Sequence, residues 1–212
     1  MDERLVDQPM RYLVHRMATS DPVPGGGSAA AMAGAMGAAL IHMVVELSVG
    51  RPDTENFAVP LTEIGVASAQ FQSELMGLVD ADAVAYAAVV HSRRLPRTTE
   101  REREARRVQF DAAIREAVRA PLAVARAASE VLDLAARLAP IGNRKAISDV
   151  GVGAMLASTA LRGAALNVEI NLPMVKGDET LRDDAAAEIR TLLDSVGERE
   201  AAVRSTVADR MP

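Results

Sequence analysis

The sequence of 212 residues has no cysteine, no tryptophan, two tyrosines, three phenylalanines and three histidines. Without cysteine, the chain cannot form disulfides, use a thiolate nucleophile or bind zinc through sulfur. The histidines show no metal-ligand spacing and no HExxH motif is present, so we expect no metal site. A net charge of −5 and an aromatic content of 2% argue against nucleic acid as a partner, because few rings are available for bases to stack on.

Hydrophobic residues are abundant, at 49% of the chain, although aromatic residues are scarce. The core must therefore consist of Ala, Val, Leu, Ile and Met, and such side chains favour closely packed helices over strands. We predict an all-α, single-domain antiparallel bundle of about six helices over residues 1–212, because short connections join long helical stretches. The expected helices cover residues 5–17, 28–49, 60–94, 100–139, 148–172 and 180–212.

The second predicted helix lies within a stretch without acidic or basic residues other than His42, from Val23 to Val45. Its length approaches that of a membrane-spanning helix. Alanine and glycine dominate it, however, and both contribute little to membrane insertion. We therefore expect a central Ala/Gly-rich helix buried in the bundle, and no membrane partner.

Two further expectations concern assembly and location. The alanine-rich faces are too numerous for one thin bundle to cover, so we expect a homodimer or higher homo-oligomer. The segment Met1-Asp2-Glu3-Arg4 has an acidic pair and no following apolar run, which argues against a signal peptide. Together with the absence of cysteine, this favours a cytoplasmic protein.

Asp82 is the most informative residue for chemistry. It lies on a helical stripe whose other members are apolar core candidates, namely Phe71, Leu75, Leu78, Ala85 or Tyr86, and Val89. A carboxylate among such neighbours has a raised pKa unless it finds a partner, and it can serve as a catalytic base or a counter-ion for a cation. Periodicity leaves open that Asp82 instead caps a neighbouring helix or pairs with an arginine. Asp80 points elsewhere on the helix and is expected to be solvated.

A run of glycines precedes the second predicted helix. In Pro24-Gly25-Gly26-Gly27-Ser28, bare backbone amides at a helix N-terminus could hold an anion or a ligand carbonyl, and Ser28 could cap the helix. The run is neither a Walker loop nor a GxGxxG motif. A flexible entry turn is the alternative interpretation.

Two other helical stretches carry candidate ligand contacts. In the fifth helix, Asp149, Gly153, Leu156, Ala160, Gly163 and Asn167 share one line with Asn171 close by, which suggests a shallow floor for a flat ligand. Alternatively, Asp149 beside Ser148 only caps the helix. The run from Arg93 to Arg107 mixes Arg and Glu as a solvated face does, although an anionic ligand tail could use Arg93, Arg94 or Arg97.

Together these segments resemble the cyclodeaminase/cyclohydrolase family of folate enzymes, which includes the cyclodeaminase half of formiminotransferase-cyclodeaminase and methenyltetrahydrofolate cyclohydrolases. The pieces that carry the resemblance occur in order along nearly the whole chain, and each alone is loose. They are Pro24–Ser28 followed by Gly34–Leu40, Leu78–Ala83, Leu95-Pro96, Ala120–Leu122, Gly142-Asn143 with Ser148-Asp149, and Asn167–Asn171.

The resemblance implies an all-helical subunit that acts as a homodimer or higher oligomer on a reduced folate, with no metal or other cofactor. It implies that Asp82 is catalytic. It also implies that the folate cleft includes Gly25, Gly26, Gly27, Ser28, Arg51, Asn143, Ser148, Asp149, Asn167 and Asn171.

Three functions follow as hypotheses. The first is hydrolysis of 5,10-methenyltetrahydrofolate to 10-formyltetrahydrofolate, favoured because the sequence has no formiminotransferase half. The second is a formiminotetrahydrofolate cyclodeaminase, which releases ammonia and forms the methenyl compound. The third is a non-catalytic binding or oligomerisation module of the same fold. The segment Gly50–Glu55 favours the third, because it departs from the family pattern except at Arg51, whereas Asp82 and Asn143 argue against it.

Overall fold

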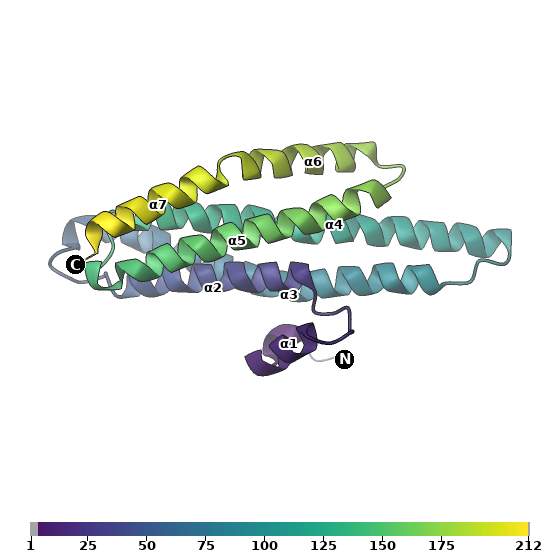
Figure 1. Cartoon of the computed structure of the whole chain (residues 1–212), viewed down its shortest axis with the longest axis horizontal. Coiled ribbons are helices and arrows are strands. Elements are labelled where there is room, and N and C mark those ends of the chain that lie inside the picture. The colour runs from purple at the N-terminus through teal and green to yellow at the C-terminus, as the bar shows by residue number, and fades with distance from the viewer. Residues whose placement is uncertain (1–3, 212) are drawn as a thin grey trace.

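The computed structural model describes residues 4–211, and this part of the chain contains helices and no strand (Figure 1). The α-helices are α1 (Met10–Met17), α2 (Gly26–Glu46), α3 (Ala58–Arg94), α4 (Glu100–Leu138), α5 (Ile147–Asn171), α6 (Glu179–Asp194) and α7 (Val196–Arg210). Short 3-10 helices are η1 (Leu5–Asp7), η2 (Glu55–Phe57), η3 (Arg144–Ala146) and η4 (Leu172–Met174). The predicted all-α class is confirmed. The prediction about Met1–Arg4 falls largely on residues outside the described part.

The alanine- and glycine-rich helix α2 is central, as predicted, and packs against α3, α4 and α5. Glycines allow two of these helices to touch backbone to backbone. A Cβ added to Gly37 of α2 would lie 2.9 Å from the carbonyl oxygen of Gly153 on α5, and one added to Gly153 would lie 3.1 Å from the carbonyl oxygen of Gly37. The pair of glycines therefore sets the close approach of α2 and α5.

Two stretches, Gly26–Glu46 and Glu55–Arg94, are long and apolar enough to cross a membrane by length and composition alone. Core helices of globular bundles pass the same criterion. In α2 the apolar residues lie against three neighbouring helices, and Ala31, Ala38, Ile41 and Val44 are completely buried. Burial within the bundle accounts for the composition of α2.

The long helices α3 and α4 run side by side and project beyond α2 and α5 at the end of the bundle where the chain turns between them (Figure 1). The start of α4 has a capping box: the Glu102 amide donates to the Thr99 hydroxyl oxygen at 3.2 Å, and the Glu102 carboxylate accepts from the Thr99 amide at 2.8 Å. These reciprocal bonds satisfy amides that the first helical turn leaves free.

The first and last predicted helices differ from the structure. The first is interrupted between η1 and α1, because Pro9 forces the preceding Gln8 into an extended conformation (φ −84°, ψ 149°). The last is divided at Ser195 into α6 and α7. Both halves pack on α4 and α5, so the bundle buries Ile189 on one side of the break and Val196 and Val203 on the other.

Candidate functional site

A cavity of about 270 Å³ opens where the N-terminus of α2 meets the middle of α3 and the end of α5. We call it the Asp82 cleft. It is lined by Pro22, Val23, Gly25, Gly26, Gly27, Asp82, Ala83, Tyr86, Ala117, Asn167 and Asn171. The cleft therefore unites the glycine run, the aspartate of the apolar stripe and the asparagines at the end of the fifth helix, which the sequence separates by as much as 146 positions (from Gly25 to Asn171).

Asp82 is held by the first turn of α2. The Ser28 hydroxyl lies 3.1 Å from Asp82 Oδ2 and 3.0 Å from the carbonyl oxygen of Val79, one turn earlier on α3. Ser28 is fully buried behind the cleft. The N-cap of α2 is Gly25, with no side-chain cap, so the expectation that Ser28 caps its own helix is wrong. Instead, the buried hydroxyl is directed across to α3.

The pKa of the Asp82 carboxyl is set mainly by burial among apolar neighbours. Val79, Ala83 and Ala85 around it are buried. Burial raises the pKa of the Asp82 carboxyl above its ordinary value, and hydrogen bonds from the hydroxyl and amide of Ser28 oppose that rise. The carboxyl thus has both properties that the sequence left as alternatives: it is a desolvated acid–base group, and it is bonded at the N-terminus of a neighbouring helix.

The glycines are required by how close α2 comes to Asp82. A Cβ at Gly27 would lie 2.0 Å from Asp82 Oδ1 and 2.5 Å from its Cγ, a distance that no side chain tolerates. At Gly26 the nearest atom would be Asn167 Nδ2 at 3.4 Å, an ordinary contact. Gly27 therefore makes room for the carboxylate itself, which is a stricter role than a flexible entry turn.

Two asparagines from the end of α5 form the opposite wall. Asn167 Nδ2 donates to the Gly163 carbonyl at 2.8 Å. Asn171 Nδ2 donates to the carbonyls of Ala117 at 2.8 Å and Asn167 at 2.9 Å. Both amide nitrogens are used to fix the side chains. Within residues 4–211 no protein donor reaches either Oδ1, so both oxygens can accept hydrogen bonds from a ligand.

Tyr86 is a cleft residue that the sequence analysis did not select as a ligand contact. It lies one turn after Asp82 on α3, its side chain is 44% exposed, and it lines the cleft. The sequence did offer a signal, because Tyr86 is one of only two tyrosines in the chain and lies one helical turn from the candidate catalytic residue. The loop before α2 is held from the other side by Arg16 of α1, which donates to the Val23 carbonyl at 3.0 Å.

Four other predicted site residues lie at the far end of α2, outside the Asp82 cleft of their own chain. Arg51 pairs with Asp53 at 3.0 Å, just after α2. Asn143 is buried; its Nδ2 donates to the Leu47 carbonyl at 2.8 Å and its Oδ1 accepts from the Lys145 amide, which ties the α4–α5 turn to the end of α2. Ser148 is exposed, and Asp149 lies in the first turn of α5.

The distance between these four residues and the Asp82 cleft follows from the antiparallel packing of α2 and α5. The start of α5 lies beside the end of α2, and the 21 residues of α2 separate the two ends by about 30 Å.

Asp80 also differs from its expected solvated state. Its carboxylate accepts from the Leu5 amide at 2.7 Å and from Arg4 Nε at 3.1 Å. Asp80 thus anchors the N-terminal segment on α3, whereas Asp82 faces the cleft. The two aspartates of the Asp-Ala-Asp sequence are separated because residues two apart on a helix point in different directions.

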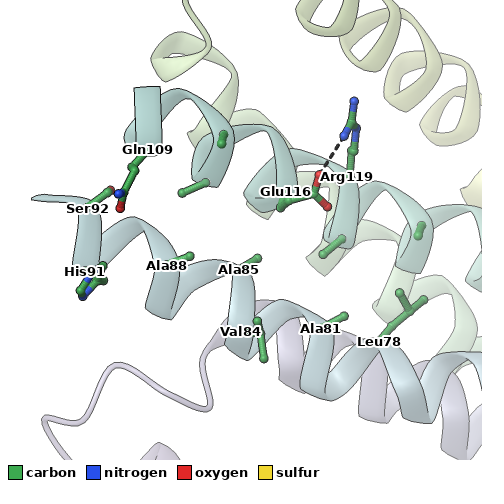
Figure 2. A pocket seen from close by; sticks show the side chains of 14 residues that line it. Leu78, Ala81, Val84, Ala85, Ala88, His91, Ser92, Gln109, Glu116 and Arg119 are labelled. Carbon is green, nitrogen blue, oxygen red and sulfur yellow. Dashed lines mark hydrogen bonds and ion pairs between the residues drawn. The ribbon is translucent and has the colours of Figure 1, made fainter. Parts of the chain in front are cut away.

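A larger cavity, a groove of about 680 Å³, lies between α3 and α4 (Figure 2). Figure 2 shows Leu78, Ala81, Ala85 and Ala88 along α3, with the Glu116–Arg119 ion pair on α4. Seven of its fourteen lining residues are alanines, and Val84 is 68% exposed. We call it the α3–α4 groove. Its apolar surface carries no candidate catalytic carboxylate except the paired Glu116.

The fold and the site define an all-helical protein in which a desolvated carboxylate on α3, bonded to the first turn of the central helix α2, faces a small cleft. The profile of the formiminotransferase-cyclodeaminase family matches residues 9–191. The chain belongs to the formiminotransferase-cyclodeaminase family, as the ordered motifs predicted.

Individual relatives agree with this assignment. Methenyltetrahydrofolate cyclohydrolase of Methylorubrum extorquens is 36% identical over 92% of this chain and 93% of its own length. Formimidoyltransferase-cyclodeaminase of Rattus norvegicus is 32% identical over 99% of this chain, which spans 38% of the rat protein. The crystal structure of formiminotetrahydrofolate cyclodeaminase from Thermotoga maritima superposes with a TM-score of 0.84 at 23% identity, covering 95% of this chain and 96% of that one, and shows the same fold.

Proposed function

We propose that the protein hydrolyses 5,10-methenyltetrahydrofolate to 10-formyltetrahydrofolate in the Asp82 cleft, with Asp82 as the catalytic group. The observation that carries the proposal is the desolvated Asp82 carboxyl, bonded to Ser28 and open to a cleft. Similarity over nearly the full length of the Methylorubrum extorquens cyclohydrolase supports the choice of reaction.

The substrate has a cationic bridge, because its positive charge is shared by N5, the bridging carbon and N10. A carboxylate in a water-poor cleft attracts such a cation more strongly than it would in water. Asn167 and Asn171 line the same cleft, and their side-chain oxygens, which accept no hydrogen bond within residues 4–211, suit the N–H groups of a pterin ring. The exposed Tyr86 ring offers a flat apolar surface for the p-aminobenzoyl group.

The reaction then needs only proton transfers by the side chain. Asp82 takes a proton from water as the oxygen attacks the bridging carbon. The bond from that carbon to N5 breaks, N5 takes the proton from Asp82, and the new hydroxyl loses its proton to solvent as the formyl group forms. A raised pKa suits the first of these transfers, because a carboxylate with a higher pKa is a stronger base and takes a proton from water more readily.

A second candidate is the cyclodeaminase reaction, favoured by the relatives that carry that name. Here N10 would attack the formimino carbon on N5, and ammonia would leave with a proton supplied by Asp82. The same cleft, carboxylate and asparagines would serve, because both reactions pass through a tetrahedral carbon between N5 and N10.

One spectroscopic experiment tests both reactions. Purified protein is mixed separately with methenyl- and formiminotetrahydrofolate, and the absorbance of the methenyl group is followed. Accelerated loss of that absorbance supports the cyclohydrolase, and its appearance with ammonia release supports the cyclodeaminase. No change in either mixture would contradict both and favour a non-catalytic module.

We further propose that the protein acts as a cytoplasmic homodimer or higher homo-oligomer without a metal or other cofactor. The exposed alanines and Val84 of the α3–α4 groove support assembly, because an apolar groove of this size is rarely left in water. Val84→Arg should reduce the molar mass measured by light scattering to that of a monomer. The same mass for wild type and variant would remove this groove as the interface.

A further inference from the structure

The loop between α1 and α2 forms one edge of the Asp82 cleft. Pro22, Val23 and Gly25 of this loop line the cleft, and Gly25 is the N-cap of α2. The loop is compact, because a Cβ added to Gly25 would lie 3.3 Å from the carbonyl oxygen of Pro22. We call residues 21–25 the cleft rim. The position of the cleft rim relative to α3 and α5 sets how wide the cleft opens.

The cleft rim is held by one arginine of α1. Arg16 Nη2 donates to the Val23 carbonyl at 3.0 Å and forms an ion pair with Asp21 Oδ2 at 3.2 Å. Arg16 Nη1 donates to the Tyr12 hydroxyl at 2.9 Å, and the guanidinium group lies over the Tyr12 ring, 5.7 Å from its centroid. A single planar group with several donors therefore connects α1 to two residues of the rim, which a lysine could not do with the same geometry.

The helix that carries Arg16 lies to one side of the long helices (Figure 1). Leu13 of α1 is buried, whereas most of the other residues of α1 are exposed. The segment before α1 is fixed to α3, because Asp80 accepts from the Leu5 amide at 2.7 Å. At the other end of α1, Arg16 makes the connection to the cleft rim. The amino-terminal segment thus links the middle of α3 to the rim.

The contacts of Arg16 are separate from those that fix the rest of the cleft. Asp82 is held by Ser28, and Asn171 is held by the Ala117 carbonyl. Arg16 does not belong to the lining of the cleft, and it reaches the rim from α1. Loss of the Arg16 side chain should therefore displace the rim and leave the carboxyl of Asp82 in place.

We propose that Arg16 is a positioning residue for substrate binding, which holds the cleft rim at the distance from Asp82 and Asn167 that a folate requires. This inference rests on the proposed function. Arg16 acts through the Val23 carbonyl and does not touch the substrate. Its loss should therefore change KM, which reflects the fit of the substrate in the cleft, more than kcat, which depends on proton transfer by Asp82.

The kinetic test uses two substitutions of Arg16 in the full chain. Arg16→Met keeps an apolar stem over Tyr12 and removes every donor, so the KM for 5,10-methenyltetrahydrofolate should rise about tenfold with little change in kcat. Arg16→Lys keeps the charge but lacks the planar group, and its KM should lie between those of the wild type and Arg16→Met. An unchanged KM in Arg16→Met, or a loss confined to kcat, would overturn the proposal.

Arg11→Met is the matched control. Arg11 is an exposed arginine of the same helix, whereas the contacts with the rim belong to Arg16. Arg11→Met should keep the wild-type KM. An equal rise of KM in the Arg11 and Arg16 variants would indicate a general effect of positive charge on α1 and contradict a specific role of Arg16.

Hydrogen exchange measured by mass spectrometry separates this inference from the proposed function, because it requires no substrate. Peptides that cover residues 19–27 should exchange faster in Arg16→Met than in the wild type or Arg11→Met, and peptides around Asp82 should exchange equally in all three. Faster exchange of residues 19–27 would support the role of Arg16 even if no folate were turned over. Turnover of methenyltetrahydrofolate with wild-type exchange of these residues in Arg16→Met would overturn that role and leave the role of Asp82 intact.

Discussion

The Ser28 hydroxyl oxygen lies 3.1 Å from Asp82 Oδ2 and 3.0 Å from the Val79 carbonyl oxygen, so one buried hydroxyl proton has two acceptors. When Asp82 is ionised, Ser28 can donate to the carboxylate. When Asp82 holds a proton, Ser28 can turn its own proton to Val79 and accept from Asp82. The hydroxyl can thus satisfy both protonation states of the carboxyl, which is what a group that gains and loses a proton in each turnover requires.

Asp82→Asn should abolish turnover, with kcat reduced by about 10³-fold or more, because a general acid–base group is lost. The helical circular dichroism spectrum should be unchanged. Wild-type rates in this variant would exclude Asp82 from the mechanism.

The same variant should be more stable than the wild type at neutral pH. Since burial raises the pKa of Asp82, the folded chain holds this proton more tightly than the unfolded chain does. The contribution of Asp82 to stability therefore falls as pH rises from the ordinary carboxyl range through the raised pKa. Melting temperatures of wild type and Asp82→Asn should converge in acid, where both side chains are neutral. A gap that is widest in acid would contradict this sign.

Ser28→Ala should move the acidic limb of the pH–rate profile to higher pH. The hydroxyl of Ser28 lowers the pKa of Asp82 against the effect of burial, so its removal raises that pKa further. Activity that depends on ionised Asp82 then appears only at higher pH. Ser68→Ala is the control, because Ser68 is equally buried but bonds to the Gly65 carbonyl. An unshifted limb in Ser28→Ala would show that this hydrogen bond does not tune Asp82.

Gly27→Ala should reduce activity far more than Gly26→Ala does. The new Cβ at Gly27 would lie 2.0 Å from Asp82 Oδ1 and must displace the carboxylate, whereas at Gly26 the closest contact is 3.4 Å. Steady-state kinetics of both variants, with melting curves to confirm folding, make the comparison. Equal losses would mean that the glycine run matters for its flexibility and not for the room it leaves Asp82.

Gly37→Val should destabilise the fold by about 2–3 kcal/mol, because added side-chain atoms would separate α2 from α5 at the Gly37–Gly153 contact. Gly77→Ala on α3 is the matched control: nothing lies within 4 Å of its Cβ position, so helix propensity alone should stabilise by about 0.5–1 kcal/mol. Chemical denaturation measures both free energies of unfolding. A Gly37→Val protein as stable as the wild type would show that the two helices can move apart without loss.

Much of the molecule could be predicted from the sequence because it depends on local rules. The scarcity of aromatics and the abundance of small apolar residues indicated helices, and Thr99 with Glu102 marked the start of α4. Helical periodicity placed Asp82 among apolar neighbours, since residues three and four apart share a face whatever the surroundings. The order of the motifs along the chain was sufficient to indicate the family.

Only the tertiary structure decided which side chains meet. Periodicity shows which side of a helix a residue occupies but not which helix covers that side. The sequence therefore could not show that Ser28 bonds to Asp82 and not to its own helix, or that Asp80 holds the N-terminal segment. Nor could the sequence show that Asn143 donates to the Leu47 carbonyl at the end of α2, about 30 Å from the Asp82 cleft. Helix packing gave Asp82 its cleft and its hydrogen-bond partner, because the α2 N-terminus and the α5 asparagines close around it only when these helices are side by side.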